Sequence, residues 1–343
     1  MRRALIVLTA LLVLLYVAAR LTSGAVEAWL EEPFDGAAGR IVMIEVPRGA
    51  TAAEVARDLA AAGVIRDPRV LQWWLRATGR AGQIHAGNYE FSGAHSIREV
   101  ADVLLSGRVI LRAVTIPEGS TRWQVAEAVA AAGFGEYEEA LAATGRAELI
   151  ADLDPEAQDL EGYLFPDTYM APERAAAAEV VEMMVQRFRR TWTASRQALA
   201  EGRGMSLREI VTLASLVETE AAVAHERPLV AAVYENRLQR GMLLQCDPTL
   251  LYALALDGRT DRNIRRADFE NDSPYNTYRF RGLPPGPIAN PGEASLEAAL
   301  RPAAVEYLYF VARNDGSHAF SRTLREHNAM VDRYQRGGRR RGQ

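Results

Sequence analysis

The chain has 343 residues, a mass of 37.7 kDa and a net charge of −4. This length allows two or three domains with a sizeable core, and the slightly acidic balance argues against a general nucleic-acid-binding protein. All forty basic residues are arginine, which excludes enzymes that need a catalytic lysine. The single cysteine excludes an intramolecular disulfide, and the five histidines form no His-Glu-x-x-His motif. We therefore expect no metal and no cofactor.

An apolar run that follows two N-terminal arginines fills residues 4–21, interrupted only by Arg20. We expect a single-pass transmembrane anchor there, with residues 1–3 in the cytoplasm and the rest of the chain exported. A cleaved signal peptide is the alternative, but the run is long for one and no clean cleavage site follows it. A buried core helix is the third interpretation.

Residues 22–40 are predicted to form a tether, and a repeat begins behind it. The pattern of residues 46–63 recurs at residues 116–133, and a weaker copy starts at Phe91. Each copy predicts a short strand, a tight turn and a helix that begins with a capping box. The three boxes are Thr51 with Glu54, Ser96 with Glu99, and Thr121 with Gln124. Small units of this kind resemble LysM modules, which bind cell-wall glycans, so we expect a LysM-like α+β region over residues 41–134. A plain α+β scaffold is the alternative.

Residues 135–204 are predicted to be a mostly helical connecting region. An aromatic loop interrupts it at residues 161–169, and one long helix is expected from about residue 172 to 200.

A strongly apolar helix opens the next segment, with Ser206 and Glu209 as its capping box. Glu218 and Glu220 fall at its C-terminal end. Carboxylates at the end of a buried helix must be hydrogen-bonded, ion-paired or protonated. Two positions apart, they are separated by about 200° around the helix and cannot share a face. Spacing alone does not choose between them, and both could simply face solvent.

Residues 213–220, with the sequence LASLVETE, resemble the signature helix of the endolytic murein transglycosylase (YceG-like) family. The resemblance covers essentially the whole chain and continues through residues 224–227, 233–238, 241–249, 275–278, 282–288, 290–292, 307–311, 318–320 and 327–328. Two positions depart from the family pattern. Ala221 stands where a threonine is usual, and Cys246 stands where a serine or threonine is usual. Both changes affect hydroxyl hydrogen bonds rather than the carboxylates.

The resemblance implies an α+β catalytic domain over residues 205–335, followed by a basic tail at 336–343. It implies that Glu220 is the catalytic residue. It also implies substrate-binding residues in the wall of the cleft: Glu218, Gln245, Asp247, Tyr275, Asn276, Tyr278, Asn290, His318 and Asn328. Desolvation at an apolar helix end is expected to raise the pKa of Glu220.

The implied activity is cleavage of the MurNAc–GlcNAc bond inside nascent peptidoglycan strands, which leaves 1,6-anhydro-MurNAc ends and terminates elongation. One carboxylate suffices because the muramyl 6-hydroxyl of the substrate is itself the nucleophile. The implied location is the bacterial cytoplasmic (inner) membrane, with peptidoglycan strands and peptidoglycan synthases as partners. Two alternatives remain: a non-catalytic peptidoglycan-binding scaffold of the same fold, and a hydrolase that uses Glu218 as its second carboxylate.

Overall fold

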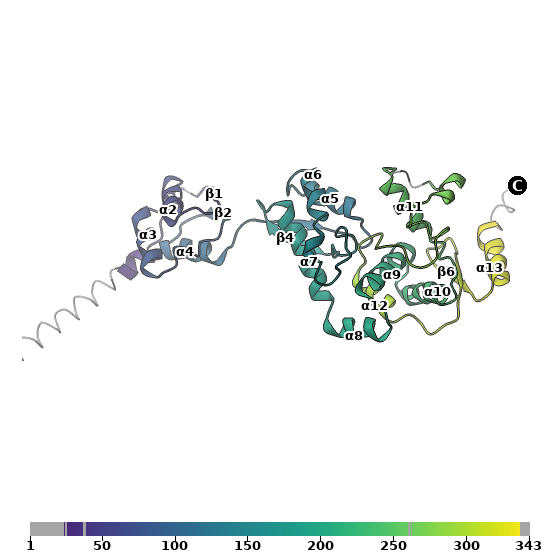
Figure 1. The fold of residues 1–343 in the computed structure, drawn as a ribbon. Helices are drawn as coiled ribbons and strands as arrows, with labels where there is room; N and C mark the ends of the chain where they lie inside the picture. Colours follow the sequence, from purple (N-terminus) through teal and green to yellow (C-terminus); the bar gives the residue numbers. More distant parts are fainter. Residues whose placement is uncertain (1–23, 25, 37–38, 260, 262, 337–343) are drawn as a thin grey trace, which may run out of the picture. The chain divides into compact units, whose positions relative to one another are not determined.

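The computed structural model describes residues 24, 26–36, 39–259, 261 and 263–336. The chain divides into two compact units. Figure 1 colours the ribbon by residue number, so the segments of each unit can be followed along the chain. Unit 1 runs to Arg112 and includes Ala171–Arg174, and unit 2 contains Ala113–Met170 and the chain from Ala175 onward. Two of the three crossings fall within strands, β3 (Leu111–Thr115) and β4 (Thr168–Pro172), and the third follows Arg174.

Between residues 40 and 110, unit 1 contains two strands and three helices. Its elements are β1 (Ile41–Val46), α2 (Ala52–Ala61), α3 (Pro68–Ala77), β2 (Gly87–Ser92) and α4 (Ile97–Ser106). The strands are antiparallel, with Ile41 opposite Ser92 and Val46 opposite Gly87. Strand β1 turns Ile44 and Val46 into an apolar core, and the three helices cover that core with buried leucines and valines.

The three predicted capping boxes are confirmed at the starts of α2, α4 and α5 (Arg122–Ala131). Each Ser or Thr side chain accepts a hydrogen bond from the third helical N–H, and the Glu or Gln side chain reaches back to the capping residue. The copy at residues 116–133 lies in unit 2, since α5 follows Arg112. The likeness to LysM modules stays a prediction.

The predicted anchor at residues 4–21 lies outside the described residues, as do residues 1–3 and most of the basic tail. Within the described part of the chain, no helix combines the length and apolarity needed to cross a bilayer.

Unit 2 is mainly helical. Besides α5 it contains α6 (Tyr137–Thr144), α7 (Ala177–Thr191), α8 (Ala194–Gly202), α9 (Leu207–Glu220), α10 (Arg227–Gln239), α11 (Asp247–Leu256), α12 (Glu293–Leu300) and α13 (Leu324–Val331). Strands β5 (Tyr309–Ala312) and β6 (His318–Ser321) form an antiparallel pair. Short 3-10 turns lie at Ala147–Leu149, Ala224–Glu226 and Arg266–Glu270, and a π turn at Asp332–Arg336 follows α13. Helix α9 is the centre of the unit and packs against α8, α10, α11 and α12.

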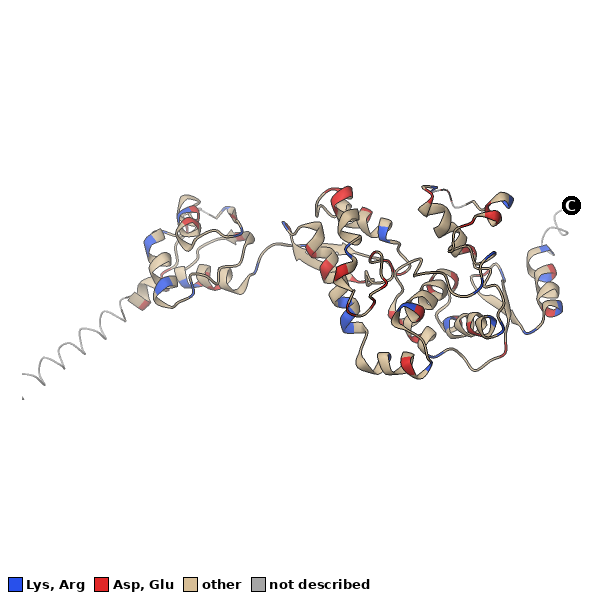
Figure 2. Cartoon of the chain, in the orientation of Figure 1, with Lys and Arg blue, Asp and Glu red and all other residues tan. Residues whose placement is uncertain are grey.

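The prediction of one long helix after residue 172 is wrong. The segment begins as β4, and its helical part is divided into α7 and α8. Trp192 leaves the helical conformation, and the Thr193 side chain then accepts from the backbone N–H of Arg196 as a new N-cap. Helix α7 has acidic Glu179 in its first turn and basic Arg189 and Arg190 in its last, the order that the helix dipole favours (Figure 2).

The loop that follows residue 160 is buried rather than exposed. Leu160, Tyr163, Leu164 and Phe165 are all at most 4% exposed. Gly162 has a φ of +86°, and a Cβ there would lie 2.5 Å from Pro287 and 2.8 Å from Val211 of α9. Only glycine allows this loop to pack so closely on α9.

Candidate active site

Glu220 is the last residue of α9. The helix starts with the predicted Ser206–Glu209 capping box, and every residue from Ile210 to Val217 is buried. The chain then turns to an extended conformation at Ala221. The Glu220 carboxyl group therefore lies at the end of an apolar helix, where its side chain is partly exposed.

Two donors converge on one oxygen of Glu220. The Tyr234 hydroxyl of α10 lies 3.3 Å from Oε1, and the Cys246 thiol, just before α11, lies 3.4 Å from the same atom. Oε2 accepts no hydrogen bond from any described residue. One oxygen is thus held by two protein donors, and the other keeps its hydrogen-bonding capacity.

Burial raises the pKa of Glu220 above its ordinary value, and the negative charge of Asp247 acts in the same direction. The hydrogen bonds from Cys246 and Tyr234 and the proximity of His318 oppose this shift. Desolvation is larger than these opposing effects, so the pKa of Glu220 is raised, in the direction that the sequence predicts. Such a carboxyl group can hold a proton at a pH where an exposed glutamate would lose it.

Glu218 lies in a different environment, although it is only two positions away. Its side chain is 5% exposed and forms an ion pair with Arg227, whose Nη2 lies 3.1 Å from Oε1. Its Oε2 accepts a hydrogen bond of 2.9 Å from the backbone N–H of Gly292. The same Arg227 Nη2 also lies 3.6 Å from Oε2 of Glu118. Both oxygens of Glu218 are therefore engaged by protein groups, which distinguishes it from Glu220.

Three predicted residues gather where α11 begins. Gln245 is exposed and has a φ of +51°, and its N–H donates to Thr277 O at 3.2 Å. Asp247 is exposed, and its Oδ1 accepts a short hydrogen bond from the Tyr278 hydroxyl. Burial raises the pKa of Tyr278, with Asp247 and then Glu220 adding to the effect. Asp247 and Tyr278 are therefore close enough to Glu220 to interact with its charge.

His318 approaches the same site from β6. Its Nδ1 lies 2.7 Å from Glu226 Oε2, and its backbone N–H also donates to that carboxylate. Phe310 packs edge-on against the imidazole with the ring centres 5.3 Å apart. Glu226 therefore fixes both the position and the orientation of a ring whose charge acts on Glu220.

The predicted amides Asn276 and Asn290 are fully buried and already paired. Asn276 Nδ2 donates to Phe269 O and Asn271 O. Asn290 joins distant segments, since its Oδ1 accepts from Leu164 N and its Nδ2 donates to both Ser120 O and Glu161. Both side chains hold loops in place instead of facing the carboxylate.

Tyr275 and Asn328 lie apart from the carboxylate. Tyr275 is at one end of a row of three aromatic rings. Its ring centre lies 5.0 Å from that of Tyr252, and the ring centre of Tyr252 lies 5.3 Å from that of Trp123. Asn328 is exposed on α13. No contact of either residue with Glu220 exists among the described residues.

Sequence reasoning did not select Tyr234, Glu226 or Glu161 as site residues. Tyr234 is buried on α10, and burial is the main reason that its pKa is raised. Glu161 is buried in unit 2, where desolvation raises its pKa to about 8 and the backbone N–H of Arg122 opposes that shift. Tyr234 and Glu226 fall within segments 233–238 and 224–227, so the family resemblance was the signal that could have found them.

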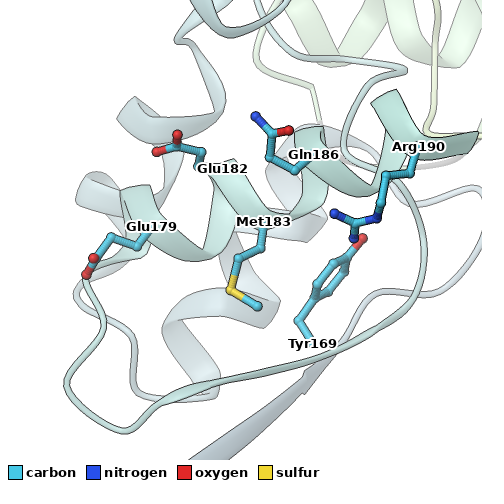
Figure 3. A pocket seen from close by; sticks show the side chains of 6 residues that line it. All are labelled: Tyr169, Glu179, Glu182, Met183, Gln186 and Arg190. Atoms are coloured by element: carbon cyan, nitrogen blue, oxygen red, sulfur yellow. The ribbon is translucent and has the colours of Figure 1, made fainter. Parts of the chain in front are cut away.

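Two cavities in unit 2 are lined by other residues. A groove of about 410 Å³ beside α7 is lined by Tyr169, Glu179, Glu182, Met183, Gln186 and Arg190. In Figure 3, Arg190 and Tyr169 point toward one another across it. A larger cavity of about 570 Å³ adjoins the N-terminal half of α9. None of the predicted site residues lines either cavity.

Comparison with known proteins now adds to this geometry. The model of the YceG-like family matches residues 44–333. The chain is 32% identical over 321 residues to a Bacillus subtilis protein named endolytic murein transglycosylase, covering 89% of this chain and 88% of that protein. It is 27% identical to a Streptococcus pneumoniae protein of the same name, spanning 59% of that longer chain. A crystal structure of a YceG-like protein from Listeria monocytogenes matches with a TM-score of 0.58 and 32% identity, covering 84% of this chain and 98% of that one. The chain belongs to the YceG-like family.

Proposed function

We propose that this protein is a peptidoglycan lytic transglycosylase that cleaves glycan strands internally, with Glu220 as the catalytic acid and base. The names of the Bacillus and Streptococcus relatives support the activity. The observation that carries the assignment of Glu220 is its pair of donors on Oε1, which leaves Oε2 open at the end of a buried helix.

The proposed reaction starts with the protonated carboxyl group. Glu220 gives its proton to the glycosidic oxygen as the bond from that oxygen to C1 of MurNAc breaks. The resulting carboxylate then takes the proton of the muramyl 6-hydroxyl, whose oxygen bonds to C1. The products are a free GlcNAc 4-hydroxyl and a 1,6-anhydro-MurNAc end. No water is consumed, and Glu220 ends protonated, as it began.

The surroundings of Glu220 suit both halves of this cycle. Desolvation favours the protonated form that the first step needs. Tyr234 and Cys246 donate to Oε1, so the carboxylate formed after proton transfer is stabilised without blocking Oε2. The site therefore favours the acid form before proton transfer and stabilises the carboxylate after it.

The residues predicted for the wall of the cleft have different roles in this proposal. We assign substrate contacts to Gln245, Asp247 and Tyr278, which present exposed or partly exposed polar groups beside Glu220. His318 is assigned to the electrostatic environment of Glu220. Glu218 is assigned to positioning, because its ion pair with Arg227 ties the end of α9 to the start of α10.

The remaining parts of the proposal concern location. An N-terminal anchor at residues 4–21 would hold the enzyme in the cytoplasmic membrane, with the bulk of the chain outside. From there it would act on strands as synthases make them, and so terminate elongation. The predicted tether at residues 22–40 would be shorter than expected, because Leu30 is buried in the core of unit 1 and Phe34 forms a backbone bridge with His95.

A hydrolase is the rival chemistry. Glu218 does not fit the role of second carboxylate, because both of its oxygens are engaged. Asp247 is the exposed carboxylate whose charge acts on Glu220, and it would be the base for an attacking water. The products separate the two reactions.

The test uses the full chain in detergent with uncrosslinked glycan strands, and compares wild type with Glu220→Gln. Glu138→Gln, an exposed carboxylate on α6, is the matched control. We expect wild type and the control to release internal fragments with anhydro ends, and Glu220→Gln to release none. Intact strands with a folded wild-type protein would favour the scaffold alternative.

A further inference from the structure

The cavity of about 570 Å³ in unit 2 lies toward the opposite end of α9 from Glu220. Side chains of α9 and α10 line it together with the segment just before α9 and the loop at residues 282–285. It is distinct from the proposed catalytic site, since Glu220, Tyr234 and Cys246 are not among its lining residues.

Three buried polar atoms on residues that line this cavity make no hydrogen bond with a described residue: Thr212 Oγ1, Arg203 Nε and Arg208 Nη2, the last of which is ion-paired with Asp154. Thr212 is 1% exposed, and its hydroxyl makes no hydrogen bond. Arg203 Nε is also buried without a partner, while Arg203 Nη2 donates to Glu235 at 2.9 Å and so fixes the guanidinium. An unpaired buried polar group carries a desolvation cost. A ligand oxygen that accepts from Arg203 and Thr212 would remove that cost.

The other charges at the cavity are already balanced. Arg208 pairs with Asp154, its Nη2 lying 2.9 Å from Oδ2. Glu209 is occupied by the capping box of α9, where its Oε2 accepts from the Ser206 N–H. Arg203 and Thr212 therefore provide the donors that remain available.

The rest of the wall is mostly aliphatic, apart from Gln239, whose Nε2 donates to Glu235. Met205, Leu238, Leu283 and Pro284 contribute to it, and none of the described lining residues is aromatic. Flat aromatic faces suit sugar rings, whereas aliphatic walls around two donors suit a short peptide with small side chains and carbonyl or carboxylate oxygens.

We infer that this cavity binds the peptide stem of the strand whose muramyl residue lies at Glu220. The inference rests on the proposed function. Thr212 and Glu220 are eight positions apart on α9, which corresponds to about 12 Å along the axis and about 80° around it. An extended peptide of about four residues spans roughly 13 Å. The segment from Tyr278 to Leu283 connects the catalytic site with the cavity. Tyr278 donates to Asp247 beside Glu220, and Leu283 lines the cavity.

The test compares strands that carry stems with strands from which an amidase has removed them. Wild type is expected to cleave stem-bearing strands with a kcat/KM roughly threefold to tenfold higher, the effect of one hydrogen bond. Thr212→Val and Arg203→Gln should lose that preference and keep the activity on stripped strands. Thr144→Val is the matched control, since Thr144 is buried on α6 and its hydroxyl is bonded to Leu141 O. It should keep the preference.

A binding measurement separates failure of this inference from failure of the proposed function. Calorimetry with stem peptides released by the amidase should show binding to the wild-type full chain and weaker binding to Thr212→Val. Thermal unfolding of each variant verifies its fold. Equal cleavage of both strand types by wild type would overturn the inference and leave the proposed function intact. If no strand is cleaved, the proposed function fails, and the absence of peptide binding would then overturn the inference as well.

Discussion

The Cys246 thiol lies 3.4 Å from Glu220 Oε1 and donates a hydrogen bond to it. This contact joins the end of α9 to the start of α11, two segments that are 26 positions apart. The family resemblance implies a serine or threonine at this place, so the thiol stands where a hydroxyl is expected. The function of the side chain, donation to the carboxylate, is retained.

Removing this donor should shift the pH dependence of cleavage. The thiol hydrogen bond lowers the pKa of Glu220, so Cys246→Ala should raise that pKa. The acid form is the one that cleaves, so the alkaline limb of the kcat/KM profile should move to higher pH. The shift should be less than about one unit, because one hydrogen bond contributes about 1 kcal/mol and a pKa unit about 1.4 kcal/mol. Cys246→Ser should keep the wild-type limb, and an identical limb in all three proteins would contradict the account.

Glu218→Gln should act on stability. The Glu218–Arg227 pair is largely buried, with side chains 5% and 13% exposed, and loss of Glu218 leaves Arg227 with the half-exposed Glu118, 3.6 Å away, as its ion-pair partner. We expect the free energy of unfolding to fall by about 1–3 kcal/mol in denaturant titrations. Glu297→Gln is the control, since Glu297 pairs with Arg301 on the surface, and it should cost less than about 1 kcal/mol. Lost activity with unchanged stability would instead assign Glu218 to the chemistry.

Local signals in the sequence predicted much of the fold. The capping boxes at Thr51, Ser96, Thr121 and Ser206 depend on residues three positions apart, and all four are present. The apolar helix that ends at Glu220 was also evident from its own residues. These features require no knowledge of distant parts of the chain.

Features that depend on contacts between distant parts of the chain could not be predicted in this way. Glu218 and Glu220 differ because Arg227 and Gly292 happen to reach one and not the other. Asn290 is buried because Leu164 and Ser120 approach it from far along the chain. The break between α7 and α8 was missed because the apolar pattern continues through Trp192.

Glu161 should make stability depend on pH. Burial raises its pKa from an ordinary value of 4.5 to about 8. Between these values the unfolded chain has released the proton and the folded chain keeps it, so stability falls as the pH rises through this window. The fall attributable to this group is on the order of a few kcal/mol.

Glu161→Gln should remove that part of the pH dependence, because an amide stays neutral and can still accept from the Arg122 N–H. Urea midpoints measured at pH 5 and pH 8 should lie closer together in the variant than in wild type. Parallel changes in both proteins would show that Glu161 does not keep its proton in the folded state.

Glu220→Gln should separate activity from stability. We expect the cleavage rate to fall by about 10²–10⁴-fold, which is the contribution typical of a general acid and base. The melting temperature should be unchanged or raised at neutral pH, because the variant no longer places a carboxyl group with a raised pKa in this apolar site. A large drop in melting temperature would mean that the loss of activity reflects misfolding.

The most direct test of the central claim is the chemical form of the new strand end when cleavage is carried out in water enriched in oxygen-18. An intramolecular attack by the muramyl hydroxyl takes no oxygen from the solvent. We predict that mass spectrometry will find anhydro ends without the heavy isotope for wild type and no new ends for Glu220→Gln. Reducing ends that carry oxygen-18 would contradict the account, because they would show that water is the nucleophile.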